Sequence, residues 1–222
     1  MRLPRAEAHD LEFLPELAAD PDTEPFLAPI SAQTPEEFAE EIDRAGREPR
    51  HYGRLIIERD LVGSAERMGS VAYEVANRRS RIAYVYELAA ASRYRGRGSG
   101  VEAAWLLVRF LIEELGYHRI QVEIYAFNER AIRVAERAGF IREGLKRKAY
   151  WRNETWIDRV MLGIVAEDID RLIVARPRIT SRPSSAVRVA AAVSPAAAGG
   201  REPTAPGLCK PSLARWVVTV AV

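Results

Sequence analysis

Three glycines at alternate positions, Gly96, Gly98 and Gly100, separate an apolar run from a run with helical spacing. The apolar run Ile82–Ala91 predicts a buried strand, and the apolar positions of Val101–Leu115 predict a helix. Because glycine has no Cβ, the backbone between them can turn tightly and approach a ligand closely. The helix directs its unpaired N–H groups and the positive end of its dipole toward the same place. This order predicts a pyrophosphate-binding loop, with a simple tight turn as the alternative.

Two common phosphate-binding loops do not fit this segment. The dinucleotide fingerprint requires G-x-G-x-x-G, whereas the glycines here are spaced G-x-G-x-G. A P-loop ends in Gly-Lys followed by Ser or Thr, and the chain contains no such tripeptide. Arg95 and Arg97 flank Gly96 and add positive charge beside the expected phosphates.

The residue pattern predicts alternating helices and strands. Thr34 to Glu37 is a helix start, with an N-cap threonine, a proline and a capping-box glutamate, and that helix is expected to end at Gly46. Before it, Leu3–Leu17 predicts a short strand and then a helix from about Ala8. Further strands are expected at 52–59, 68–77, 82–91, 118–126, 140–149 and 155–165, and helices at 101–115 and 129–138. This order predicts a three-layer α/β domain on a mostly antiparallel sheet.

The composition is that of an ordinary globular chain. Of its 222 residues, 48% are hydrophobic and 29% are charged. No apolar run approaches the roughly 20 residues of a membrane span, and charged residues interrupt Met1–Leu14, so no signal peptide is expected. One cysteine, Cys209, allows no internal disulfide, and three scattered histidines predict no metal site. A cytoplasmic location is expected.

Residues 173–222 differ from the rest of the chain. They carry seven Lys or Arg and one acid, a net charge of +6, whereas residues 1–172 carry 26 basic and 30 acidic residues, a net −4. Pro177–Pro211 is rich in Pro, Ala, Ser and Gly, which predicts disorder, and Ala214–Val222 is apolar with a strand-like composition. The tail is expected to be a solvated segment without a catalytic role, and a basic arm for RNA is the alternative.

Three ordered motifs are similar to those of the GNAT N-acetyltransferase superfamily. Arg95, Gly98 and Gly100 form R-x-x-G-x-G, which resembles the acetyl-CoA pyrophosphate loop of that family. The wider segment Ser92–Gly98 resembles its P-E-Y-R-G-K-G motif, with Ser92 in place of the proline.

The other two motifs follow downstream. Asn128–Ala131 and then Glu136–Phe140 resemble the N-x-x-A and E-K-x-G-F segments of the family. Tyr150–Asp158, followed by Met161-Leu162, resembles the closing hairpin of the ribosomal-protein-serine/alanine N-acetyltransferase-like subgroup.

The resemblance implies a GNAT-type α/β/α fold whose sheet splays at the fourth strand, here 82–91. It implies an acetyltransferase domain over residues 1–172 that uses acetyl-CoA as co-substrate and acetylates a primary amine by direct attack, without a covalent enzyme intermediate. A protein N-terminal α-amine is the expected acceptor, and a small-molecule amine such as an antibiotic is the alternative. A non-catalytic acyl-CoA-binding module is the alternative of another class. No metal, membrane or nucleic-acid partner is expected.

The resemblance also assigns residues to the acetyl-CoA site. A backbone N–H of Leu88–Ala90 would polarise the thioester carbonyl, and the small side chains there would admit the pantetheine arm, unless they only pack under a helix. Asn128 would contact the arm or its bound water, and it can also cap the next helix. The expected binding residues are Leu88, Ala89, Ala90, Arg95, Gly96, Arg97, Gly98, Ser99, Gly100 and Asn128.

Glu87 is the one carboxylate in the apolar run 82–91. Burial there would raise its pKa toward neutrality, which suits a general base that deprotonates the amine. A structural carboxylate paired with an arginine, or one placed at the splay, is the alternative. Both interpretations stay open at the level of sequence.

A proton donor for the leaving thiolate is not evident. Many family members carry a tyrosine seven residues after the asparagine, where this chain has Ala135. Tyr84, Tyr86 or water could serve instead, or the thiolate could leave unprotonated, since a thiol pKa is about 8.5. Loops around residues 20–31 and 149–155 are expected to contact the acceptor.

Overall fold

The computed structural model describes residues 1–26, 33–61, 64–169 and 220–221. Its sheet contains β1 to β6 in the order β1-β2-β3-β4-β6-β5, and β7 pairs with β3. Every neighbouring pair is antiparallel except β3–β4 and β3–β7, which are parallel. The strands are β1 Tyr52–Leu61, β2 Ser64–Asn77, β3 Ile82–Ala90, β4 Arg119–Tyr125, β5 Ile141–Arg152, β6 Thr155–Val165 and β7 Val220–Ala221.

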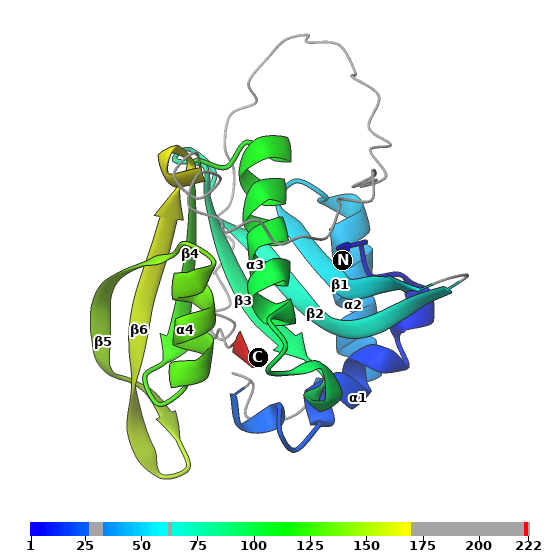
Figure 1. The fold of residues 1–222 in the computed structure, drawn as a ribbon, viewed down its shortest axis with the longest axis horizontal. Helices are drawn as coiled ribbons and strands as arrows, with labels where there is room; N and C mark the ends of the chain where they lie inside the picture. The colour runs from blue at the N-terminus through cyan, green and yellow to red at the C-terminus, as the bar shows by residue number, and fades with distance from the viewer. Residues whose placement is uncertain (27–32, 62–63, 170–219, 222) are drawn as a thin grey trace, which may run out of the picture.

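Helices cover both faces of this sheet. They are α1 Phe13–Ala19, α2 Pro35–Arg47, α3 Ser99–Arg109 and α4 Glu129–Arg137, with short 3₁₀ turns at Ala8–Asp10, Glu24–Phe26, Ser92–Tyr94 and Ala166–Asp168. α3 and α4 lie in front of the sheet in Figure 1, and α2 lies behind it. The predicted three-layer α/β arrangement on a mostly antiparallel sheet is confirmed. Within the described residues, no helix is both long and apolar enough to cross a bilayer.

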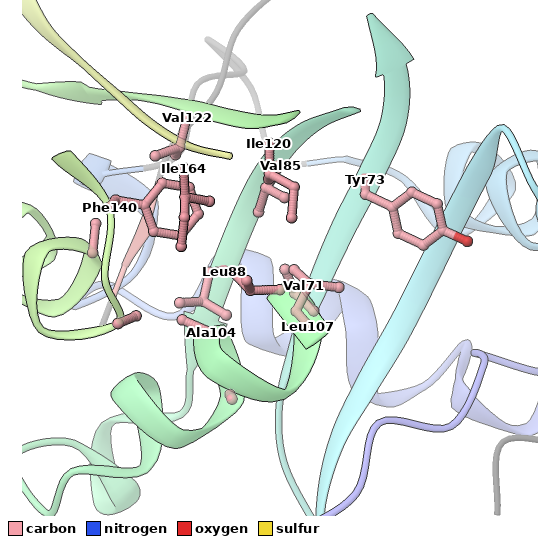
Figure 2. Packing of buried hydrophobic residues seen from close by; sticks show 14 of the residues in the cluster. Val71, Tyr73, Val85, Leu88, Ala104, Leu107, Ile120, Val122, Phe140 and Ile164 are labelled. Carbon is pink, nitrogen blue, oxygen red and sulfur yellow. The ribbon is translucent and has the colours of Figure 1, made fainter. Parts of the chain in front are cut away.

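The alternation of side chains along β1 explains the two cores. Leu55 and Ile57 join the large cluster under α3 and α4, whereas Ile56 between them joins a smaller cluster with α1 and α2. Successive side chains of a strand point to opposite faces, so one strand supplies both layers. Figure 2 shows the larger cluster, in which Leu107 of α3 packs toward Val71 of β2.

The helix boundaries agree with the sequence at some points and differ at others. Thr34 caps α2, since its Oγ1 accepts from the N–H of Glu37 at 3.3 Å and its own N–H donates to that carboxylate at 3.0 Å. α2 continues through Gly46, the expected end, to Arg47. The helix expected at 101–115 begins at Ser99 and becomes a π-helix over Phe110–Glu114.

The N-terminal segment also departs from expectation. The short strand is present only as two isolated bridges, from Arg2 to Glu58 and from Arg5 to Leu55. The helix expected from Ala8 is a single 3₁₀ turn there, and α1 begins at Phe13. Pro15 explains the break, because proline donates no backbone hydrogen bond and is tolerated only in the first turn of a helix.

The sheet opens between β3 and β4. These strands pair only where Ile82–Tyr84 lie against Arg119–Gln121, and β3 continues to Ala90 without β4 beside it. A bulge explains the divergence. Between Ser70 and Ala72, two steps of β2 oppose three steps of β3, from Ala89 to Tyr86, so β3 contains one extra residue. Such bulges bend a strand and increase its twist.

Candidate acetyl-CoA and amine site

Beyond Tyr84, one edge of the β3 backbone is not paired with β4. The N–H of Ala91 donates to the carbonyl of Met68 on β2 at 2.8 Å. Successive N–H groups of a strand point to opposite edges, so those of Ala90 and Leu88 point into the gap. β7 lies against this edge, with Val220 opposite Leu88 and Ala221 opposite Ala89. The strand-like composition of Ala214–Val222 thus corresponds to a strand at these two residues. The segment 177–211, expected to be disordered, lies outside the described residues.

The glycine-rich turn follows directly after β3. Gly96 and Gly98 have φ angles of 77° and 84°, a left-handed conformation that favours glycine, and Gly98 caps α3. The N–H groups of Val101 and Glu102 donate to the Gly98 carbonyl, as the start of a helix requires. In the described part of the chain, no acceptor meets the N–H groups of Gly98, Ser99 or Gly100. These donors and the helix dipole together form an anion-binding turn.

The two arginines of the turn have different environments. The Arg95 guanidinium donates to the carbonyls of Ala90 and Asp22, both at 2.8 Å, and to the hydroxyl of Thr23. Burial lowers the pKa of Arg95, although nearby aspartates act in the opposite direction. This side chain therefore ties the segment after α1 to the end of β3. Arg97 is exposed and has no partner among the described residues, so its charge is available to a ligand.

A cavity of about 290 Å³ lies beside this turn, lined in part by Arg95 and Asn128. Two further cations of α4, Arg130 and Arg133, also line it, and Arg130 lies close to Gly96. Sequence reasoning missed these two arginines. Their position in the first turns after the Asn128 cap is the signal that could have identified them, because a helix start beside a glycine-rich turn collects anion-binding groups.

Asn128 caps α4. Its side-chain oxygen accepts from the N–H of Ala131 at 3.1 Å, and its side chain is buried. The capping role is confirmed, and a contact with the pantetheine arm stays a prediction.

Glu87 is paired rather than isolated. It lies at the bulge of β3 with φ of 51° and is 7% exposed, and Arg54 donates to its carboxylate at 2.5 Å. The same guanidinium binds Glu41 of α2 through Nε at 2.9 Å and Nη2 at 2.5 Å. Glu87 is therefore the one carboxylate of a buried strand, as expected, and it is paired with an arginine. Whether it acts as a general base or only as a structural carboxylate stays a prediction.

Electrostatics at this triad favour the charged forms. Burial alone would lower the pKa of Arg54, but the carboxylates of Glu41 and Glu87 outweigh it and hold that pKa well above its ordinary value. Burial alone would raise the pKa of Glu41, but Arg54 reverses the shift and lowers it. One buried cation therefore stabilises two carboxylates, one from a helix and one from the edge of the gap.

The tyrosines that could protonate a thiolate lie on the same strand. Burial raises the pKa of Tyr84 and that of Tyr86, so each holds its proton at neutral pH and releases it less readily than a free tyrosine. Ala135, at the position where many relatives carry a tyrosine, is buried in the main core. These three residues were named from the sequence. Arg54, Glu41 and a second buried arginine, Arg159, were missed, because each meets its neighbours across elements that are far apart in the sequence.

Comparison with known proteins identifies related sequences. The family model for the acetyltransferase (GNAT) domain matches residues 1–141. The SPbeta prophage-derived uncharacterized N-acetyltransferase YokL of Bacillus subtilis (strain 168) is 33% identical over 85 residues, which are 38% of this chain and 48% of that protein. The probable N-acetyltransferase YjcK of the same organism is 37% identical over 75 residues, 34% of this chain and 41% of that protein. The chain thus spans less than half the length of these curated relatives.

Solved structures share the fold. A spermidine N-acetyltransferase from Vibrio cholerae, in complex with CoA and spermine, has a TM-score of 0.65 at 19% identity and covers 75% of this chain and 95% of its own. The ribosomal-protein-S5-alanine acetyltransferase from Vibrio fischeri has a TM-score of 0.63 at 16% identity and covers 75% and 93%. Since the family model matches well over half of the sequence, the chain belongs to the GNAT acetyltransferase family.

Proposed function

We propose that this chain transfers the acetyl group of acetyl-CoA to a primary amine, the N-terminal α-amine of a protein. One observation carries the proposal. β3 separates from β4 immediately before a glycine-rich helix start, so a backbone edge and a set of unbonded N–H groups lie next to each other. A long ligand with an amide-bearing arm and a pyrophosphate needs both features together.

The residues present fit acetyl-CoA, which would supply the activated acetyl group as a thioester. Gly98, Ser99 and Gly100 would hold the pyrophosphate through backbone N–H groups, and a Cβ at Gly98 would project into open space where the ligand is expected. Arg97 would add charge, and Arg95 would hold the turn in place through its three contacts. Leu88, Ala89 and Ala90 would border the arm, after β7 leaves this edge.

Two N–H groups at the gap, those of Leu88 and Ala90, would polarise the thioester carbonyl and stabilise the oxyanion that forms on attack. We assign Glu87 a positioning role, because its carboxylate is engaged by Arg54 at the bulge that opens the gap. Water would then remove the proton of the amine. With the pKa values of Tyr84 and Tyr86 raised, the thiolate would leave unprotonated and take a proton from solvent.

Release of free thiol from acetyl-CoA tests the proposal, measured with a panel of N-terminal peptides, polyamines and amine antibiotics. Turnover with the peptides supports the main proposal, and turnover confined to small amines supports the small-molecule alternative. Tight acetyl-CoA binding without turnover of any amine would instead favour a non-catalytic binding module. The cytoplasmic location and the 172/173 domain boundary stay predictions.

A further inference from the structure

Arg159 of β6 is a buried cation that forms no salt bridge with any carboxylate in the described part of the chain. Its residue is 0% exposed, and among the described residues none of its three guanidinium nitrogens has a hydrogen-bond partner. The cost of burying an unpaired charge is high, so native proteins nearly always pair buried guanidinium groups with an acceptor. The missing partner of Arg159 is therefore informative about a ligand.

The contacts of Arg159 within the described residues are aromatic and leave its N–H donors unmet. The ring of Tyr150 lies 3.8 Å and that of Tyr125 lies 4.4 Å from the guanidinium carbon, and the two rings lie edge to face with their centroids 6.1 Å apart. Neither ring accepts a hydrogen bond from the three guanidinium nitrogens. Nearby carboxylates are committed elsewhere: Glu123 accepts from Lys146, and Asp158 accepts from the N–H of Lys148 at 2.7 Å. A planar carboxylate fits this fork of donors in a bidentate manner.

Arg159 also lies on the correct face and near the gap. It sits opposite Tyr125 of β4, while its neighbour Val160 packs into the core under α3 and α4. The Arg159 side chain therefore lies on the opposite face of the sheet, the face covered by α1 and α2. Arg54 pairs with Glu87 on that same face. Tyr84 of β3 shares a side-chain hydrogen bond with Glu123 of β4, so it joins the two strands that border the gap. Burial and Glu123 raise the pKa of Tyr84, whereas Arg159 acts to lower it.

Because Arg159 is 0% exposed, a ligand would reach it only after a covering side chain such as Tyr150 moves. The pairing of β5 with β6 passes from Lys146 opposite Arg159 to Tyr150 opposite Ile157, so residues 147–149 bulge out of the ladder. Lys148 within this bulge has φ of 50°. Bulges re-aim side chains beside active sites, and Tyr150 belongs to the 149–155 segment expected to line the acceptor site. The covering ring thus comes from an irregular part of the sheet.

We propose that Arg159 binds a carboxylate of the acceptor, so that this enzyme acetylates amines that carry a carboxylate and disfavours purely cationic amines. The carboxylate can belong to an amino acid or to an acidic residue near a peptide N-terminus. This inference rests on the proposed function for the amine itself, but its test does not require turnover.

The test is a titration of the full chain saturated with CoA, with matched pairs of amines. One arm uses glycine, β-alanine and γ-aminobutyrate against their carboxamides. The other arm uses Ala-Glu-amide against Ala-Gln-amide, which distinguishes a peptide carboxylate from a free amino acid. In at least one pair the carboxylate should bind at least about tenfold more tightly, the value of a charge-assisted hydrogen bond.

Arg159→Gln should abolish that preference and leave CoA binding unchanged, and Arg159→Lys should keep part of it. The matched control is Arg119→Gln, a cation of β4 that is already paired with Glu143, which should keep the full preference. Equal binding within every pair, or a preference that survives in Arg159→Gln, would overturn the proposal. Failure of all amines in the thiol-release assay would count against the proposed function and not against this binding result.

Discussion

Glu87→Gln separates a structural carboxylate from a general base. Arg54 is 1% exposed and has two carboxylate partners, so the substitution leaves Glu41 to neutralise the guanidinium. Glutamine can still accept a hydrogen bond, and the loss is that of one charge-assisted bond, about 1.5–3 kcal/mol of unfolding free energy. For a domain of this size that loss corresponds to about 3–12 °C in Tm.

The assay combines thermal unfolding with a pH–rate profile for thiol release. We expect Glu87→Gln to melt earlier, while kcat stays within a fewfold of the parent and the acid limb of the profile is retained. Glu41→Gln is the matched control, because it removes the other partner of Arg54 from α2, away from the gap. It should lower Tm to a similar degree without an effect on kcat.

A different result would refute this reasoning. A fall of about 10²-fold or more in kcat with loss of the acid limb, at unchanged acetyl-CoA affinity, would identify Glu87 as the general base. In that case Glu41→Gln should keep its kcat and its acid limb. Both variants remove one carboxylate partner of Arg54, so a difference in kcat between them cannot come from the weakened ion pair.

Three further predictions concern stability and the ends of the site. Because the pKa of Glu41 is lower in the folded chain than its value of about 4.3 in the unfolded chain, its charged form stabilises the fold above that pH. The Tm of the parent should therefore fall as the pH drops below about 4.3, and the Tm of Glu41→Gln should fall less. An equal dependence of Tm on pH in both proteins would contradict the assignment. Truncation after Arg176 removes β7 from the edge of β3, so the shortened chain should keep its Tm and bind acetyl-CoA at least as tightly, and weaker binding in calorimetry would show that the tail contributes to the site. Asn128→Ala should lower Tm by a few degrees through the loss of a helix cap worth about 1 kcal/mol, and an unchanged Tm would argue against that role.

Local chemistry made much of the fold predictable. The cap at Thr34, the left-handed turn at Gly98 and the apolar run of β3 are each encoded within a few neighbouring residues, and each is found as expected. The splay of the sheet at 82–91 was expected only through the resemblance, since the extra residue in this apolar strand leaves no local mark in the sequence.

Contacts between distant segments could not be predicted in the same way. Arg54 is 13 residues from Glu41 and 33 from Glu87. The three meet only because α2 packs on β1 and because Arg54 reaches across β2 to the bulge of β3. Arg159 lies in a strand whose pattern suggests an exposed charge, and its burial depends on rings from β4 and β5. Periodicity indicates which face a residue occupies, but not which distant side chain meets it there.

The central claim is that the turn at 96–100 binds the pyrophosphate of acetyl-CoA, and calorimetric titration of Gly98→Val tests it most directly. Gly98 has φ of 84°, and nothing lies within 4 Å of the position of an added Cβ, so valine would strain the turn and project a branch toward the ligand without striking the core. We expect the parent to bind acetyl-CoA in the micromolar range and the variant to show no measurable binding while it still unfolds cooperatively. Equal binding by the folded variant and the parent would contradict the assignment of this turn.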